Sequence, residues 1–170
     1  RMLNIEDNIF FSTDRVGFEE INVLHNLADC CINISYAEGF GLGTLEAMQT
    51  GTPIIAAKTG GLTRQVVDHR DGSHNGIALE IENKSLVGSQ NVPFIYEDYV
   101  STDSVAEAIK KLYDMTPEER KELGKKCSDY VSSEFNFQNT VDMWHNTLKK
   151  TIEDWREGKS KTKRFDLVEI

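Results

Sequence analysis

One stretch decides the fold: Ser35-Tyr36-Ala37-Glu38-Gly39-Phe40-Gly41-Leu42-Gly43-Thr44-Leu45-Glu46-Ala47-Met48. The residues just before it, Cys30 to Ile34, are apolar and β-branched, which predicts a central strand. Its second half predicts a helix that begins near Leu42 and ends near Gly51. Between strand and helix, Gly39 and Gly41 lack Cβ atoms, so the backbone can turn sharply there and approach a ligand closely.

A second strand follows this helix. Pro53 opens an apolar run that extends to Ala57, and Gly60-Gly61 then turns the chain again. A strand, turn, helix and strand within roughly 30 residues form a βαβ unit, whose two strands are parallel. Strand-like and helix-like blocks continue to alternate along the chain. We therefore predict an α/β fold in which helices flank a Rossmann-like parallel sheet.

Weaker patterns flank this unit. Ile9-Phe10-Phe11 predicts a short strand, and the apolar spacing after Gly17 predicts a helix. A short apolar run covers Ile77 to Ile81. The segment Asn83 to Tyr99 has mixed polarity and no strong period, which predicts an irregular insertion with a short strand at Pro93 to Tyr96.

The C-terminal part of the chain is predicted to be helical. An amphipathic face runs from Val105 to Tyr113. Thr116-Pro117-Glu118-Glu119 is a capping box with proline at the first helical position, so a second helix begins there. A long last helix carries five apolar side chains on one side: Val141, Trp144, Leu148, Ile152 and Trp155.

Composition excludes several classes of protein. The 170 residues are 39% apolar and 28% charged, as in an ordinary globular domain, and no apolar run approaches the roughly 20 residues of a membrane span. A net charge of −9 argues against nucleic-acid binding. Three cysteines without metal-ligand spacing indicate a reducing cytosol and no metal site. The basic residues between Lys159 and Arg164 predict a solvated tail or a weak contact with a membrane surface.

The glycine-rich turn has the chemistry of a phosphate site. The unpaired N–H groups of the first helical turn face the crevice at the carboxyl end of the sheet, where open α/β sheets bind ligands. Glu46 could accept two hydrogen bonds from a vicinal diol such as a ribose, and Glu38 projects into the same crevice. Taken singly, each feature is more often structural, since a carboxylate early in a helix also complements the helix dipole.

Together these residues resemble a known family. The pattern S-x-x-E-G-F-G-L-x-x-x-E-A-M-x-x-G-x-P-I-I-A, with Glu38 and Glu46 separated by seven residues, resembles the E-x7-E motif of retaining GT-B glycosyltransferases of family four. The resemblance extends over residues 8 to 155 apart from the insertion. It implies the C-terminal domain of a GT-B fold, incomplete at its N-terminus.

The resemblance implies a role for each part of the motif. Glu38 would lie beside the donor sugar and stabilise charge at the anomeric centre. Glu46 would hold the ribose diol, and Arg15 and Val16 would pack against the nucleobase. The donor sugar and phosphates would be contacted by the bend and the first helical turn: Gly39, Phe40, Gly41, Leu42, Gly43 and Thr44.

The implied reaction transfers a glycosyl group from a nucleoside diphosphate sugar to a hydroxyl acceptor with retention of configuration. GDP-mannose is favoured over UDP-glucose and UDP-N-acetylglucosamine on family similarity. The acceptor would be a glycan, a lipid or a small molecule. No cofactor and no metal are expected, because basic side chains and the helix N-terminus neutralise the diphosphate. The location implied is cytoplasmic, with peripheral attachment to a membrane as an alternative.

The resemblance also predicts how the chain is divided. Residues 1–135 would form the nucleotide-sugar-binding domain, with the insertion at about 83–100. Residues 136–158 would form a helix that braces an N-terminal GT-B domain, and 159–170 a tail. The chain begins with Arg1, so we expect an upstream segment to be missing. That segment would carry the acceptor domain and the Arg and Lys that clamp the pyrophosphate in the family.

Two other functions are open. One is a module that binds a nucleotide sugar without transferring it, and the presence of both Glu38 and Glu46 favours an enzyme over this alternative. The other is a related GT-B sugar epimerase or phosphorylase. Those enzymes are expected to carry different catalytic residues, and the long match around Phe40 argues against them.

Overall fold

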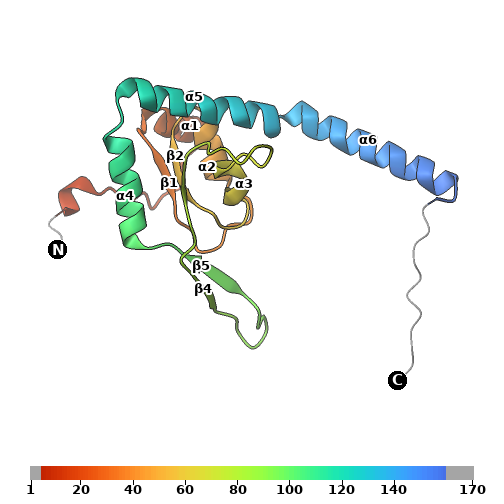
Figure 1. The fold of residues 1–170 in the computed structure, drawn as a ribbon, viewed down its shortest axis with the longest axis horizontal. Coiled ribbons are helices and arrows are strands. Elements are labelled where there is room, and N and C mark those ends of the chain that lie inside the picture. The colour runs from red at the N-terminus through yellow and green to blue at the C-terminus, as the bar shows by residue number, and fades with distance from the viewer. Residues whose placement is uncertain (1–4, 160–170) are drawn as a thin grey trace. The chain divides into compact units, whose positions relative to one another are not determined.

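A parallel sheet of three strands organises the protein. The computed structural model describes residues 5–159. The strands are β1 (Cys31–Asn33), β2 (Ile54–Ala57) and β3 (Ile77–Leu79), in the order β1-β2-β3. Cys31 pairs with Ile54 in one ladder, and Ile55 pairs with Ile77 in the other (Figure 1). The predicted α/β fold with a parallel sheet and flanking helices is confirmed.

Strand β2, not β1, is the central strand. All four β2 residues are buried, which is what a parallel strand covered on both faces requires. A strand does form within the predicted stretch Cys30 to Ile34, but it lies at the edge of the three-stranded sheet. The prediction of a central strand there is therefore wrong. Among the described residues β1 pairs only with β2, and Ile32 on β1 is exposed.

The helices form where sequence periodicity and caps predict them, with one addition. Helix α2 spans Leu42–Gln49 and contacts both β1 and β2, whereas α1 (Phe18–Leu27) packs on α2. The unpredicted helix is α3 (Leu62–Val66), a single short turn that packs on β2. Three longer helices follow: α4 (Thr102–Tyr113), α5 (Pro117–Glu134) and α6 (Phe137–Arg156).

The core lies between the sheet and helices α2, α3, α4 and α5. Its largest fully buried apolar side chains come from α2, β2 and α3, and α5 adds Val131 and Cys127. Gly124 of α5 approaches the chain after α2 so closely that a Cβ atom there would lie 1.9 Å from the Gly51 carbonyl oxygen. The capping box predicted for α5 is present, because Thr116 N donates to Glu119 Oε2 (2.7 Å) and Glu119 N to Thr116 Oγ1 (3.2 Å).

The segment predicted as an irregular insertion is an antiparallel hairpin. Strands β4 (Asn83–Leu86) and β5 (Tyr96–Tyr99) are paired, with Asn83 opposite Tyr99 and Leu86 opposite Tyr96. The hairpin projects from the sheet region in Figure 1. The predicted short strand at Pro93 to Tyr96 is displaced to Tyr96–Tyr99. The sequence lacks a hairpin pattern because several strand residues are charged or polar on both faces.

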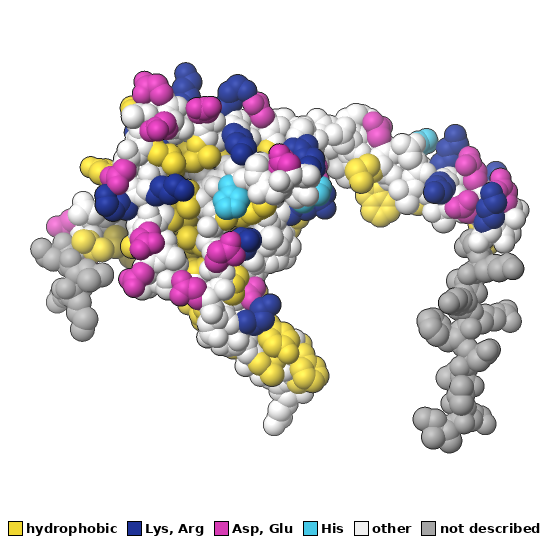
Figure 2. All heavy atoms as spheres, viewed as in Figure 1, with side chains coloured by type: hydrophobic (Ala, Val, Ile, Leu, Met, Phe, Trp, Pro, Cys, Tyr) yellow, Lys and Arg dark blue, Asp and Glu magenta, His cyan; other side chains and the backbone are white. Residues whose placement is uncertain are grey.

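The hairpin carries apolar side chains at its end and is attached at its base. Figure 2 shows hydrophobic side chains gathered over its tip, where Phe94 is among the exposed residues. At the base, Asp98 N donates to Tyr36 O (2.8 Å), and Thr59 Oγ1 donates to Asp98 Oδ2 (2.8 Å). Together with Lys84, 3.2 Å from Asp98 Oδ1, the Thr59 bond lowers the pKa of Asp98. The hairpin is thereby attached to the loops that follow β1 and β2.

The strand predicted at Ile9-Phe10-Phe11 does not form. These residues follow the short 3₁₀ helix η1 (Glu6–Asn8) as irregular backbone, and Phe10 and Phe11 are each more than 85% exposed. An apolar triplet becomes a strand only when a neighbouring strand takes its hydrogen bonds. No strand pairs with them among residues 5–159.

The chain divides into two compact units, with the boundary after Val131. The second unit contains α6, which begins at the cap residue Asn136, whose side chain accepts hydrogen bonds from Gln138 N (2.8 Å) and Asn139 N (3.2 Å). Its predicted apolar face is present and exposed, as at Trp144 and Trp155. The tail predicted for 159–170 lies outside the described residues beyond Lys159.

No helix between residues 5 and 159 combines the length and the apolar composition that a membrane crossing needs.

The turn after α3 supplies a pH-dependent part of the stability. Asp68 accepts hydrogen bonds from Arg70 Nε (2.9 Å to Oδ1) and Nη2 (2.7 Å to Oδ2), which lower the pKa of Asp68 to about 2. A carboxyl whose pKa is lower in the folded state stabilises the fold fully above its unfolded pKa, about 4, and loses that contribution as the pH falls toward 2. We expect Asp68→Asn to be less stable than the wild type at neutral pH, with the gap closing below about pH 4. Urea unfolding at several pH values measures this, with Asp129→Asn, an exposed site on α5, as the control; a gap independent of pH would contradict it.

Candidate functional site

The bend between β1 and α2 depends on a glycine at position 41. Gly41 precedes the helix with φ +87°, a left-handed conformation that strains other residues. It is also buried, and a Cβ atom there would lie 2.5 Å from Leu62 Cδ2. The conformation favours glycine, as predicted from the sequence for a sharp turn, and a larger residue would also displace the Leu62 side chain of α3.

The second glycine pair holds the bend from the other side. Gly61 N donates to the carbonyl oxygen of Glu38 (3.2 Å). A Cβ atom on Gly60 would lie 1.8 Å from Glu38 O, and one on Gly61 would lie 2.6 Å from Phe40 O. The backbone of residues 38–40 therefore packs directly on that of 60–61, and Gly60-Gly61 has a role beyond turning the chain.

Gln65, which contacts the bend, was not predicted from the sequence. This α3 residue is fully buried, and its Nε2 donates to Phe40 O (2.6 Å) and to Gly41 O (3.2 Å). The signal in the sequence was a polar residue between Leu62 and Val66, on a helical face that must be buried.

The Thr44 side chain braces the strand to the helix. Thr44 is buried, and its hydroxyl accepts a hydrogen bond from Asn33 Nδ2 (3.0 Å). Asn33 Oδ1 in turn accepts from Ser35 Oγ (2.8 Å) and Ser35 N (3.1 Å). Asn33 and Ser35 were not singled out from the sequence. This hydrogen bond holds the Thr44 side chain inside the protein, and its backbone amide lies in the first turn of α2.

The first turn of α2 presents backbone donors. The first hydrogen bond that continues the helix runs from Leu45 N to Gly41 O (3.1 Å), so the amides of Leu42, Gly43 and Thr44 precede any helical partner. Leu42 and Gly43 are exposed, and the space where a Gly43 Cβ would lie is open. An anion fits such a helix end, because free N–H groups and the positive end of the helix dipole coincide there.

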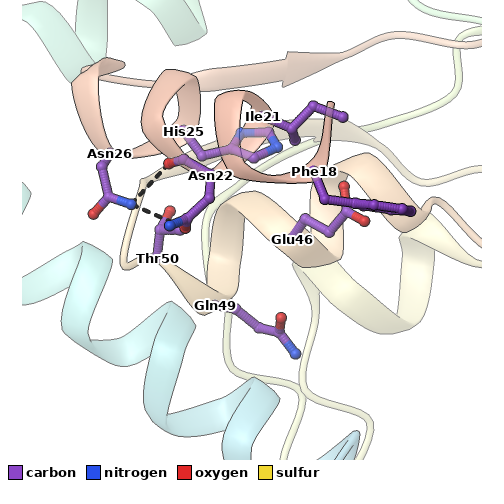
Figure 3. Close-up of a pocket in the computed structure, with 8 residues that line it drawn as sticks. All are labelled: Phe18, Ile21, Asn22, His25, Asn26, Glu46, Gln49 and Thr50. Atoms are coloured by element: carbon purple, nitrogen blue, oxygen red, sulfur yellow. Dashed lines mark hydrogen bonds between the residues drawn. The ribbon is translucent and has the colours of Figure 1, made fainter. Parts of the chain in front are cut away.

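Glu46 lies one turn further along α2 and faces α1. It is the fifth residue of the helix, about 6 Å along the axis from the first. Glu46 is half-buried and lines a groove of about 430 Å³ between the two helices. Figure 3 shows it pointing toward the first turn of α1, where Phe18 lies. The groove is lined by α1 and α2 residues and the turn after α2: Phe18, Ile21, Asn22, His25, Asn26, Glu46, Gln49 and Thr50.

Two faces of this groove differ in chemistry. Phe18 and Ile21 form its apolar part, and Phe18 is 89% exposed. Asn22 and Asn26 form a polar part, in which Asn26 Nδ2 donates to Asn22 O (2.8 Å) and Asn22 Oδ1 (3.2 Å), as Figure 3 shows. An apolar ring beside amide groups and a carboxylate suits a ligand with a flat heteroaromatic part and hydroxyl groups.

The other predicted site residues are not among those that line this groove. Glu38 is half-buried in the loop at the carboxyl end of β1, where Gly39 and Phe40 are exposed. Arg15 and Val16 lie in the irregular segment just before α1, and Arg15 is exposed. The structure thus brings the bend and Glu46 together on one helix, and it adds Phe18, which the sequence showed only as the start of a helical pattern.

Burial disfavours the thiolate form of all three cysteines. Burial raises the pKa of Cys30 to about 12 and that of Cys127 to about 11. The Cys127 thiol donates to Asn75 O (2.8 Å) in the core. These residues are structural, in agreement with the sequence interpretation.

Comparisons with known proteins find glycosyltransferase relatives of this chain. The chain is 29% identical over 133 residues to a D-inositol 3-phosphate glycosyltransferase from Paenarthrobacter aurescens, an alignment covering 78% of this chain and 25% of the relative. It therefore spans about a quarter of that protein's length.

Two solved structures share the fold. A sucrose-phosphate synthase from Thermosynechococcus elongatus is similar with a TM-score of 0.66 and 25% identity over 89% of this chain and 32% of that one. The C-terminal domain of a glycosyl transferase group 1 family protein from Francisella tularensis has a TM-score of 0.52 and 24% identity over 76% of this chain and 53% of that domain. The fold is that of a GT-B C-terminal domain.

The family profile matches most of the chain. The glycosyl transferases group 1 family aligns with residues 1–129, a range that contains the bend, α2 and the groove. The chain belongs to the glycosyl transferases group 1 family.

Proposed function

We propose that this chain is the donor-binding half of a retaining glycosyltransferase, which moves a sugar from a nucleoside diphosphate sugar to a hydroxyl acceptor. Membership of the family supports a transferase. The observation that carries the donor assignment is the arrangement on α2: free amides at Leu42 and Gly43, and the Glu46 carboxylate one turn further in a groove. About 6 Å of helix separates them, a spacing suited to a phosphate and the ribose of one nucleotide.

The proposed donor lies along the first two turns of α2. Its diphosphate accepts hydrogen bonds from the amides at the bend and the first turn, from Gly41 to Thr44. Glu46 accepts two hydrogen bonds from the ribose diol, since a carboxylate offers two oxygens to paired hydroxyls. The nucleobase then extends toward the start of α1, where Phe18 offers an exposed ring and Arg15 and Val16 lie close in sequence.

The sugar extends the other way, toward the loop after β1. Glu38, Gly39 and Phe40 are the residues of that loop, and we assign the sugar hydroxyls to them. Glu38 is proposed as the catalytic carboxylate, which stabilises positive charge at the anomeric carbon as the diphosphate leaves. The diphosphate itself accepts the acceptor's proton, so transfer needs no separate base. The helix N-terminus and basic side chains are proposed to neutralise the diphosphate in place of a metal.

The acceptor and the remaining parts of the enzyme are assigned by the resemblance. An N-terminal domain would supply the acceptor site, with a glycan, a lipid or a small molecule as acceptor and residues 136–158 bracing that domain. GDP-mannose is the donor to test first, ahead of UDP-glucose. The cytoplasm is the proposed location.

Titration calorimetry tests the donor assignment. We expect the 170-residue chain to bind GDP or UDP weakly and not to turn over their sugars, because the proposed acceptor domain is needed for transfer. Titrations with GDP, UDP, GDP-mannose and UDP-glucose identify the base and the sugar. The absence of binding with all four, both in this chain and in a longer protein that carries it, would sink the proposal.

The role of Glu38 has its own test. We expect Glu38→Ala to lower the rate of transfer by roughly 100-fold in the longer protein while changing nucleotide affinity little, because its charge acts at the anomeric carbon and not on the nucleotide. Steady-state kinetics separate kcat from KM. Glu122→Ala, an exposed carboxylate on α5, is the control and should leave both unchanged. If Glu38→Ala leaves kcat unaltered, Glu38 is not the catalytic carboxylate.

A further inference from the structure

A buried amide side chain lies directly behind the proposed phosphate site. Gln65 of α3 is fully buried, yet its Nε2 reaches two backbone carbonyls of the bend, Phe40 O at 2.6 Å and Gly41 O at 3.2 Å. Only the NH2 group of the amide can donate to carbonyl oxygens, so these two acceptors fix which end of the side chain faces the bend.

The other end of the same amide has no such partner. Gln65 Oε1 is buried and accepts no hydrogen bond among the described residues. A buried acceptor without a donor costs free energy, and an apolar side chain of the same length would avoid that cost. A glutamine at this buried position is explained if the two hydrogen bonds that it donates to the bend are needed.

Peptide geometry shows what those two bonds accomplish. In a planar trans peptide the C=O and the following N–H point in opposite directions. When Gln65 holds Phe40 O toward the core, the N–H of Gly41 must point away from it. Gly41 O accepts from both Gln65 Nε2 and Leu45 N (3.1 Å), and these two bonds together direct the N–H of Leu42 away from the core. The φ of +87° at Gly41 allows both carbonyls to converge on one donor.

The Gln65 backbone is itself held from behind. Asn75, which is buried, donates from Nδ2 to Gln65 O (3.1 Å), and its own N–H donates to Val66 O (2.8 Å). The Cys127 thiol of α5 then donates to Asn75 O (2.8 Å). A chain of buried hydrogen bonds therefore connects α5 to the bend through Gln65, and it limits how far the bend can move.

We propose that Gln65 is a positioning residue for the donor diphosphate. Its two hydrogen bonds hold the carbonyls of Phe40 and Gly41 toward the core. The carbonyl oxygens, which would repel a phosphate, then face away from the ligand, and the amides of Gly41 and Leu42 face toward it. This inference rests on the proposed function, because it concerns the same site. Preorganised donors bind an anion better than mobile ones, since no ordering cost remains to be met on binding.

Two variants test the proposal by titration calorimetry with the nucleoside diphosphate sugar that the wild type binds best. Gln65→Met keeps the length but removes both donors, and we expect it to weaken binding on the order of tenfold. Val66→Ala is the matched control, since it removes buried atoms from the same helix but no hydrogen-bond donor. It should lower thermal stability but leave the affinity unchanged.

Gln65→Glu adds a readout that a purely structural role would not move. A protonated glutamic acid can donate one hydrogen bond to the bend, whereas the ionised form repels both carbonyls, and burial favours the protonated form. We expect its affinity relative to the wild type to recover as the pH is lowered from about 8 to about 5.5. The titratable groups on and beside α3, which are Arg64, Asp68, His69 and Tyr130, and the Glu38 and Glu46 carboxylates of the proposed site are common to both proteins, so the ratio isolates position 65.

The outcomes separate the two proposals. A wild-type protein that binds no nucleotide overturns the proposed function, and this inference with it. A wild type that binds, together with a Gln65→Met protein that binds equally well, overturns the positioning role alone. Equal loss of affinity in Gln65→Met and Val66→Ala also overturns it, because stability would then explain both. If Gln65→Met does not fold, the pH dependence of Gln65→Glu decides, and a flat ratio counts against the role.

Discussion

Gly60→Ala is expected to lose about 3 kcal/mol of unfolding free energy and to lose nucleotide binding with it. Two costs combine. The backbone at Gly60 is left-handed, with φ +46°, and an alanine Cβ atom would lie 1.8 Å from the carbonyl oxygen of Glu38. That atom is backbone, so no rotamer change can relieve the overlap, and the loop carrying Glu38 and Phe40 has to move. Urea unfolding measures the stability, and calorimetry measures the binding.

Gly72→Ala is the matched control for this prediction. Gly72 also has a positive φ, +76°, but a Cβ atom there meets nothing within 4 Å. Only the conformational cost applies, about 1 kcal/mol, and nucleotide affinity should be unchanged. If the two variants lose the same stability and both retain binding, the close packing of residues 38–40 on Gly60 is not what holds the bend.

Glu46→Ala is expected to weaken nucleotide binding by about 10- to 100-fold, the equivalent of losing hydrogen bonds to a charged acceptor. The carboxylate lines the α1–α2 groove one turn beyond the amides at the helix start, and it is the only acidic side chain among the eight residues that line the groove. Its loss should affect GDP or UDP as much as their sugars, since the ribose is common to all. Calorimetry with the free nucleoside diphosphate measures the effect.

Gln49→Ala controls for the shape of that groove. Gln49 lines it from the same helix and is exposed, but it offers no carboxylate. Its removal should change the affinity less than twofold, within the ±0.5 kcal/mol of an ordinary surface substitution. Should Glu46→Ala bind nucleotide as tightly as the wild type, the ribose does not lie in the groove, and the donor would have to be placed elsewhere on α2.

The bend and the helix it starts were predictable because their signals are local. Gly39, Gly41 and the apolar run of α2 lie within a dozen residues, and backbone sterics and helical periodicity act over that range. The same holds for the capping box at Thr116 and the cap at Asn136, where a side chain bonds an amide two or three residues away. The groups on α2 that are proposed to bind the donor, its first amides and Glu46, were therefore predictable as well.

The contacts that support the bend were not predictable in that way. Gln65 bonds Phe40 across 25 residues, and Thr59 bonds Asp98 across 39. Nothing near Gln65 in the sequence indicates which carbonyl its amide will meet, because the partner is chosen by the packing of α3 on α2. The same reason explains why Phe18 was seen only as a helical residue: the groove exists only once α1 lies on α2.

Strand pairing shows the same division. The sequence by itself determined that Cys30 to Ile34 and Pro53 to Ala57 form strands around a glycine bend and a helix, because alternating blocks and turns are local properties. Only the tertiary structure decided that β2 is central, that Asn83 to Tyr99 pair as a hairpin and that Ile9 to Phe11 do not form a strand. A strand is completed by hydrogen bonds to a distant segment, and those bonds are absent from any short stretch of sequence.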